Sequence, residues 1–270
     1  MISEPADRSG VVRIAVGLEY DGTAYAGWQA QASLPTLQQV TERALSAVGA
    51  EAVSLTCAGR TDAGVHALGQ VAHFDTSAVR ATRAWVLGAN SALPADVSVA
   101  WALPVPAHFH ARYSAEARTY RYLILNRLAR GALLASRATW VHRPLDHERM
   151  SEAARALLGE HDFSAFRSSE CQAKSPVRRL EQIRVERNGD RVVIEATANA
   201  FLHHMMRNIA GLLITIGKGE RAPGWAREVL EGRDRTKNAA TAAPAGLYLL
   251  SVRYPRAFGL PEARAAVFSA

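Results

Sequence analysis

The order of apolar patterns over residues 11–105 limits the fold more than any other feature of the sequence. Alternating or β-branched runs predict strands, and apolar residues at helical spacing predict helices. The strands are expected over 12–20, 53–58, 68–74 and 96–105, and the helices over 37–48 and 81–93. Thr36 is expected to cap the first helix and Gly49 to end it. This β-α-β-β-α-β order is that of the ferredoxin-like unit.

Residues 107–255 show a second mixed pattern, which is less regular. Strands are expected over 117–125 and 246–254 and in a hairpin that turns at Asn188 and Gly189, and helices over 147–158, 201–216 and 223–232. We therefore expect an α+β fold with mainly antiparallel sheets, in two domains, 11–106 and 107–255. Residues 1–10 are expected to be a disordered tail, and residues 256–270 a second tail.

Charge indicates the kind of partner. The chain carries 32 Lys and Arg against 25 Asp and Glu, a formal net charge of +7. Such a surplus favours a polyanion, most often nucleic acid, although arginine enrichment in a GC-rich genome would give the same surplus. Two distant cysteines, no signal-peptide pattern and no apolar run of the ~20 residues that span a membrane predict a cytoplasmic protein with no membrane anchor.

The loop GRTDAGVHA (59–67), between two predicted strands, is the first candidate site. Gly59 and Gly64 allow backbone conformations closed to other residues, so a ligand can approach the loop closely. Asp62, with Arg60 two residues away, would stay ionised at neutral pH and could act as a nucleophile or a base. The alternative is an Asx-turn, in which Asp62 only accepts hydrogen bonds from backbone amides.

The helix predicted over 201–216 carries Arg207 among apolar residues. A buried arginine costs several kcal/mol unless it meets a carboxylate, so Arg207 either reaches the surface or pairs with an acid, for which Asp62 is the candidate. His203, four residues earlier, would share its face of the helix. Adjacent His203 and His204 would point about 100° apart on a regular helix, which disfavours a shared metal. We expect no metal.

Two segments combine aromatic and basic side chains. In RTYRYLI (118–124), alternation places Tyr120 and Tyr122 on one face of a strand, where tyrosines either pack in a core or stack on a base. FHARY (109–113) places His110 and Arg112 between aromatic residues, a composition that suits contact with RNA and also occurs at ordinary domain seams.

Together these segments resemble the tRNA pseudouridine synthase I family, also called the TruA family. The matching segments, in the order of the family, are YDGTAYAGWQAQ (20–31), AGRTDAGVHALGQVAHF (58–74), FHARYSA (109–115), RTYRYLI (118–124), AFRSSECQ (165–172), NAFLHHMMRNIAG (199–211) and PAGLYLLSVRYP (244–255). The resemblance runs from about Arg13 to Pro255, and only the two tails fall outside it.

The resemblance implies two RRM-like domains that form a pseudouridine-synthase core around a central basic cleft. It implies a homodimer that isomerises uridine to pseudouridine at positions 38, 39 and 40 of the tRNA anticodon arm, without a cofactor. Asp62 would be the nucleophile, Arg60 would flip the base, and Arg207 would orient Asp62 and keep it ionised. The implied substrate-binding residues are Tyr120, which would stack on the uracil, and Phe109, His110, Ala111, Arg112, Tyr113, Gln172, His203 and Leu247.

Two other classes of protein fit part of this pattern. A non-catalytic RNA-binding protein of the RRM type would have the right charge, but the sequence contains no RNP1-like run of aromatic residues. A base-removing glycosylase also uses an aspartate and a flipped base, but it releases uracil and so lowers the mass of the RNA. Whether Asp62 would add to uracil C6 or attack ribose C1′ stays open.

Overall fold

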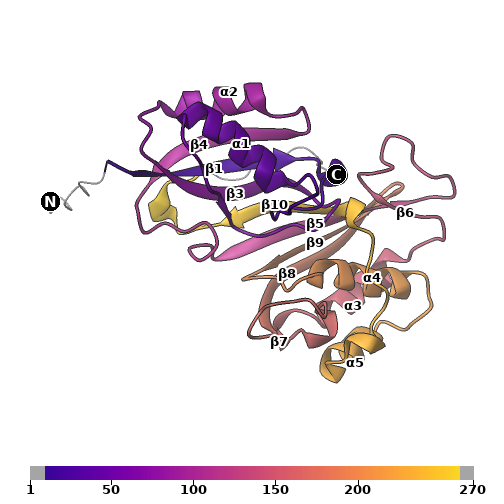
Figure 1. The fold of residues 1–270 in the computed structure, drawn as a ribbon. Coiled ribbons are helices and arrows are strands. Elements are labelled where there is room, and N and C mark those ends of the chain that lie inside the picture. Colours follow the sequence, from indigo (N-terminus) through magenta and orange to yellow (C-terminus); the bar gives the residue numbers. More distant parts are fainter. Residues whose placement is uncertain (1–9, 262–270) are drawn as a thin grey trace.

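A computed structural model describes residues 10–261, which form a mixed α+β structure (Figure 1). The strands are β1 (Val12–Tyr20), β2 (Thr56–Cys57), β3 (His66–Thr76), β4 (Val97–Val105), β5 (Ala117–Asn126), β6 (Thr139–Val141), β7 (Gly159–Asp162), β8 (Val177–Asn188), β9 (Arg191–Ala198) and β10 (Leu247–Arg253). The helices are α1 (Leu37–Gly49), α2 (Thr82–Ala92), α3 (His147–Arg155), α4 (Met205–Gly217) and α5 (Trp225–Gly232). The predicted fold class, α+β with a mainly antiparallel sheet, is confirmed.

The first half of the chain has the predicted ferredoxin-like order. Strand β1 pairs antiparallel with both β3 and β4, and β2 pairs antiparallel with β3. Helices α1 and α2 pack against each other beside these strands (Figure 1). The Thr36 hydroxyl accepts a hydrogen bond from the amide of Gln39 at 3.5 Å, as expected of an N-cap.

The strand predicted over 53–58 is wrong in length, because only Thr56–Cys57 pairs with β3. The amide of Val53 donates to the Ser46 hydroxyl at 2.9 Å, and the amide of Leu55 donates to the Glu42 carboxylate at 2.8 Å. Both acceptors lie on α1, so these amides bind helix side chains and take no part in the sheet.

Strand β10 joins the two halves of the sheet. The strands lie in the order β4-β1-β3-β10-β5-β9-β8-β7, with β2 beside β3 and β6 beside β5. Strand β10 pairs parallel with β3, where Leu249 lies opposite Ala67, and antiparallel with β5, where Leu249 lies opposite Tyr120. The loop that carries Asp62 leads directly into β3, so the seam at β10 brings this loop close to Tyr120. The domain boundary between residues 106 and 107 stays a prediction.

The second half has helices α3 and α4 against β8 and β5, with α5 beyond α3 (Figure 1). The predicted hairpin is present, and its two-residue turn is Gly189 and Asp190, with Gly189 at a φ of +56°. One hydrophobic cluster runs through both halves, from Trp28 and Trp85 to Phe166 and Leu212.

The predicted tails are described only in part, because residues 1–9 and 262–270 lie outside the described range. Arg256–Phe258 forms a 3-10 helix, and the Phe258 ring lies 5.1 Å from that of Phe109. Between residues 10 and 261, no helix is both long and apolar enough to span a membrane.

Candidate active site

The loop between β2 and β3 is hydrogen-bonded to β1, to the segment that follows β1, and to β3. The amide of Trp28 donates to the Thr61 carbonyl at 2.9 Å, and the Tyr20 and Thr61 hydroxyls are hydrogen-bonded at 2.9 Å. The Gln70 side chain donates to the Gly59 carbonyl at 2.6 Å. Gly59 and Thr61, which both precede Asp62, are therefore bound to the core, and they fix the position at which the partly buried Asp62 leaves it.

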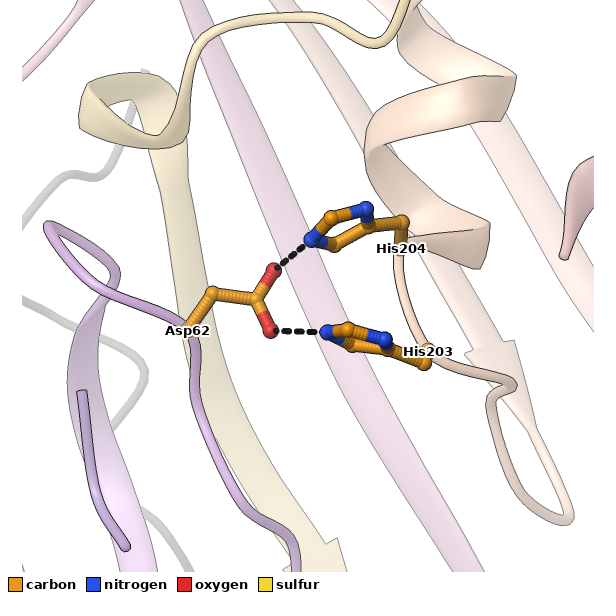
Figure 2. A group of neighbouring side chains, drawn as sticks. All are labelled: Asp62, His203 and His204. Carbon is orange, nitrogen blue, oxygen red and sulfur yellow. Dashed lines mark ion pairs between the residues drawn. The ribbon is translucent and has the colours of Figure 1, made fainter. Parts of the chain in front are cut away.

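Three nitrogen-bearing side chains surround the Asp62 carboxylate. Arg207 Nη1 lies 3.0 Å from Oδ2, His203 Nε2 lies 3.3 Å from Oδ1, and His204 Nε2 lies 3.3 Å from Oδ2. Figure 2 shows both imidazole rings pointing at the carboxylate from the segment before α4. The Asp62 side chain is 21% exposed, so the group is sheltered and still reachable.

The predicted ion pair between Asp62 and Arg207 is confirmed as a contact. Arg207 is 14% exposed, and its Nε also donates to the Ala242 carbonyl at 2.8 Å, so the guanidinium is fixed on two sides. Within residues 10–261, no backbone amide donates to the Asp62 carboxylate, so the Asx-turn alternative is wrong.

The helix predicted from residue 201 begins at Met205, and this changes where the two histidines point. His204 has a left-handed backbone with φ of +63°. The His203 carbonyl accepts from the amide of Ser168 at 3.0 Å, and the His203 amide contacts Cys171 Sγ at 3.5 Å. These contacts with the 168–171 loop hold His203 outside the helix. The expectation of two helical histidines 100° apart is therefore wrong: their rings lie 4.0 Å apart and face the same carboxylate.

Tyr120 lies on β5 beside the Asp62 loop. A Cβ at Gly59 would lie 3.6 Å from its hydroxyl, and its ring meets that of Phe201 edge-to-face at 4.9 Å. Burial, and then the charge of Asp62, raises the pKa of Tyr120 well above its usual value, so its hydroxyl stays protonated at neutral pH. Tyr120 is 9% exposed, whereas Phe201 is partly exposed, so Phe201 is the ring of this pair that is more open to solvent. The sequence analysis did not single out Phe201.

The 109–113 segment divides into buried and exposed side chains. Phe109 and Ala111 are both 0% exposed and pack beneath the segment. Tyr113 is 76% exposed; its ring centroid lies 4.3 Å from that of His110, and the guanidinium carbon of Arg112 lies 5.7 Å from it. His110, Arg112 and Tyr113 are thus the members of the segment whose side chains can meet a ligand.

His73, on β3, binds the backbone of the 109–113 segment. The Ala111 amide donates to His73 Nδ1 at 3.2 Å, which requires an unprotonated nitrogen. Burial, and then the charges of Arg13 and His110, lowers the pKa of His73 from its ordinary value near 6.5 to about 4. His73 is therefore neutral in the folded protein at pH 7.

We expect this depressed pKa to make the protein less stable in mild acid. Between pH 6.5 and about 4, unfolded chains bind a proton at residue 73 that folded chains do not, so the free energy of unfolding decreases as pH falls through this window. His73→Gln should lose less stability than the wild-type protein between pH 7 and 5 in urea titrations. His142→Gln, at an exposed position, is the control, and equal losses in all three proteins would contradict the prediction.

Three predicted site residues lie apart from the carboxylate contacts. Arg60 is exposed, and no hydrogen-bond or ion-pair partner binds its guanidinium within the described range. Gln172 is exposed in the loop before β8. Leu247 is 5% exposed at the start of β10, opposite Tyr122, so its side chain belongs to the core.

Arg118 is a buried arginine that the sequence analysis did not single out. It is 8% exposed and donates four hydrogen bonds of 2.7–3.2 Å, all to backbone carbonyls. The acceptors are those of Ala58, Arg112, Ala115 and Asn199. One guanidinium thus ties the base of the Asp62 loop to the 109–113 segment and to the segment that leads to His203. The sequence offered one signal for a buried, hydrogen-bonded arginine, namely the polar start, RTYR, of a strand that is otherwise apolar.

Comparisons with known proteins show the family of this chain. The family model described as tRNA pseudouridine synthase matches residues 18–114 and 153–255. The chain belongs to the tRNA pseudouridine synthase family. The matched ranges of this family contain Asp62, His203 and Arg207, whereas Arg118 and Tyr120 lie between them.

Individual members of the tRNA pseudouridine synthase family are similar over most of their length. The tRNA pseudouridine synthase A of Pseudomonas aeruginosa is 58% identical over 255 residues, which is 94% of this chain and 90% of that protein. The tRNA pseudouridine synthase A of Methylococcus capsulatus is 57% identical, over 95% of this chain and 94% of that protein. The tRNA pseudouridine synthase A of Coxiella burnetii, strain Dugway 5J108-111, is 55% identical, over 93% of this chain and 97% of that protein.

Proposed function

We propose that this protein isomerises uridine to pseudouridine at positions 38, 39 and 40 of the tRNA anticodon arm. The observation that carries the proposal is the Asp62 carboxylate, held on the GRTDAG loop with Arg207 at 3.0 Å. The relatives described above, which are 55–58% identical to this chain, are named tRNA pseudouridine synthase A, which supports the reaction class. A homodimer in the cytoplasm is part of the proposal, and light scattering in solution tests the dimer.

The reaction needs one nucleophile and no redox carrier. The C1′–N1 bond breaks, the base turns, a C1′–C5 bond forms, and the proton of C5 is lost while N1 gains one. Asp62 acts as the nucleophile, since a carboxylate that has added to the substrate can also leave again. It adds to uracil C6 or attacks ribose C1′. Arg207 orients the carboxylate and balances its charge. The balance of atoms requires no cofactor.

Aromatic and basic groups around the site provide the RNA contacts. A target base in a stem must leave the helix, at a cost of about a few kcal/mol, before Asp62 can reach it. Tyr120 and Phe201 form the aromatic wall for the flipped uracil. The partly exposed His110 and the exposed Arg112 and Tyr113 offer a stacking surface and a positive charge to the flanking nucleotides.

Incubation with an unmodified tRNA transcript that has uridines at positions 38–40 tests the proposal. Selective chemical labelling should map pseudouridine to those positions, while the mass of the RNA stays unchanged. Free uracil and a lower RNA mass would assign the chain to the glycosylase class. Binding of tRNA without any product would assign it to the non-catalytic RNA-binding class.

Arg60 is expected to act in base flipping, because it is exposed, unpaired in the described range and two residues from Asp62. Arg60→Ala should reduce turnover at least about tenfold more on a base-paired target than on a loop target, since only the paired base has to be extruded. Single-turnover rates on matched stem and loop substrates measure this difference. Arg43→Ala removes an exposed arginine on α1 and is the control; equal losses on both substrates for Arg60→Ala would refute the flipping role.

A further inference from the structure

Asp62, His203 and His204 form a cluster with the composition of a metal site (Figure 2). One ligand atom from each residue lies within 4.8 Å of the other two. All three side chains are partly exposed, between 21% and 33%, so an ion can enter from solvent. The residues come from two separate segments, the loop before β3 and the segment before α4.

The spacing of the ligand atoms matches a small divalent ion. Zinc binds imidazole nitrogen and carboxylate oxygen at about 2.0–2.2 Å, which places neighbouring ligand atoms of a tetrahedron about 3.4 Å apart. His203 Nε2 lies 3.3 Å from Oδ1, His204 Nε2 lies 3.3 Å from Oδ2, and one ligand atom from each of the three residues lies within 4.8 Å of the others, so small side-chain movements bring them to this spacing. The two rings are tilted by 38° with centroids 4.0 Å apart, and both Nε2 atoms face the Asp62 carboxylate.

Arg207 is compatible with such an ion because it contacts only one carboxylate oxygen. Its Nη1 contacts Oδ2, which His204 Nε2 also approaches at 3.3 Å, whereas Oδ1 is contacted by His203 alone within the described range. Carboxylates that bind a metal commonly accept a hydrogen bond from an outer partner. Arg207 would occupy that outer position while Oδ1 and the two imidazoles bind the ion.

We propose that Asp62, His203 and His204 bind Zn²⁺ and that the bound ion inhibits the isomerase. Two imidazoles and one carboxylate suit Zn²⁺, whereas Mg²⁺ prefers oxygen ligands alone. Inhibition follows because the carboxylate bound to the ion is the proposed nucleophile. This second half of the proposal rests on the proposed function, whereas the binding site does not.

Binding of Zn²⁺ to the full chain without RNA tests the site. Isothermal titration should give one ion per chain, and Co²⁺ at the same site should give visible absorption that Zn²⁺ removes. His203→Gln and His204→Gln should each weaken Zn²⁺ binding about 100-fold, and His142→Gln, at an exposed position elsewhere, should leave it unchanged. Excess Mg²⁺ should not compete.

Three results would overturn the site. They are no zinc bound to the wild-type protein, wild-type affinity for Zn²⁺ in the His203 and His204 variants, or a loss of affinity in the His142 variant as large as that in the His203 and His204 variants. Asp62→Asn removes the ligand charge without changing the histidine segment and should also weaken binding, which guards against misfolded histidine variants. Thermal melts of each variant without metal check the fold.

Inhibition is measured separately on the tRNA substrate. Zn²⁺ should suppress turnover with the dissociation constant found by titration, a chelator should restore it, and Mg²⁺ should not act. Binding without inhibition would overturn the inhibitory role alone, and a lack of any isomerase activity would leave the binding result intact.

Discussion

Asp62→Asn is expected to abolish turnover while tRNA still binds. The amide keeps the shape of the side chain but lacks the charge and the nucleophilic oxygen, so single-turnover rates should fall by at least about 10⁴-fold. Binding should persist, since it depends mainly on Lys and Arg contacts with phosphates. Rates from rapid quench and dissociation constants from filter binding, both at one salt concentration, separate the two effects.

Asp75→Asn is the matched control for this variant. Asp75 also binds an arginine, with its Oδ1 2.7 Å from Arg13 Nε, but it lies far along β3 from the loop. Its replacement removes the same charge and also breaks an ion pair. We expect turnover close to that of the wild-type protein, and activity of Asp62→Asn within tenfold of wild type would refute the assignment of the nucleophile.

Arg118→Met is expected to have the largest effect on stability. Four carbonyls lose a charged donor at once, and since one such hydrogen bond contributes about 1.5–3 kcal/mol, the free energy of unfolding should fall by at least about 3 kcal/mol. Turnover should fall as well, because the segments on either side of Asp62 lose their common anchor. Urea titrations and single-turnover rates measure the two losses.

Arg121→Met is the control for Arg118→Met. Arg121 lies on the opposite face of the same strand and contacts Glu195 at 2.8 Å, and since Glu195 also pairs with Arg184 at 3.0 Å, its carboxylate keeps a cationic partner when Arg121 is replaced. We therefore expect a smaller loss of stability than for Arg118→Met. Arg118→Lys restores the charge without the planar fork and should recover only part of the loss. Equal effects of Arg118→Met and Arg121→Met would show that the buried anchor has no special role.

The contact between Asp62 and Arg207 was predictable because it follows from a local conflict. An arginine within the apolar NAFLHHMMRNIAG segment needs a carboxylate, and the GRTDAG loop offers one. The start of α4 was not predictable in the same way. The apolar spacing continues through Phe201 and Leu202, and only the contacts of His203 with the 168–171 loop end the helix at Met205. Because the helix begins at Met205, the two histidine rings face one carboxylate and do not point about 100° apart.

Long-range hydrogen bonds account for the other features that the sequence analysis missed. The alternation over 53–58 predicts a strand, but α1 supplies the acceptors for Val53 and Leu55. Arg118 looks like an ordinary strand residue until the fold brings the carbonyls of Ala58 and Asn199 to it. Periodicity reports which face of an element is apolar, and it contains no information about which distant group completes a hydrogen bond.

The position of β10 has a consequence for the synthesis of the protein. Residues 247–253 follow every other strand of the described chain in sequence, yet they lie between β3 and β5 and join the Asp62 loop to Tyr120. A nascent chain emerges from its N-terminus, so the first half can fold long before its neighbour strand exists. Until β10 inserts, the β3 edge beside the active-site loop is an unpaired template for other strands. The Asp62 loop and Tyr120 are therefore joined through the strand that is synthesised last among the strands of the described chain.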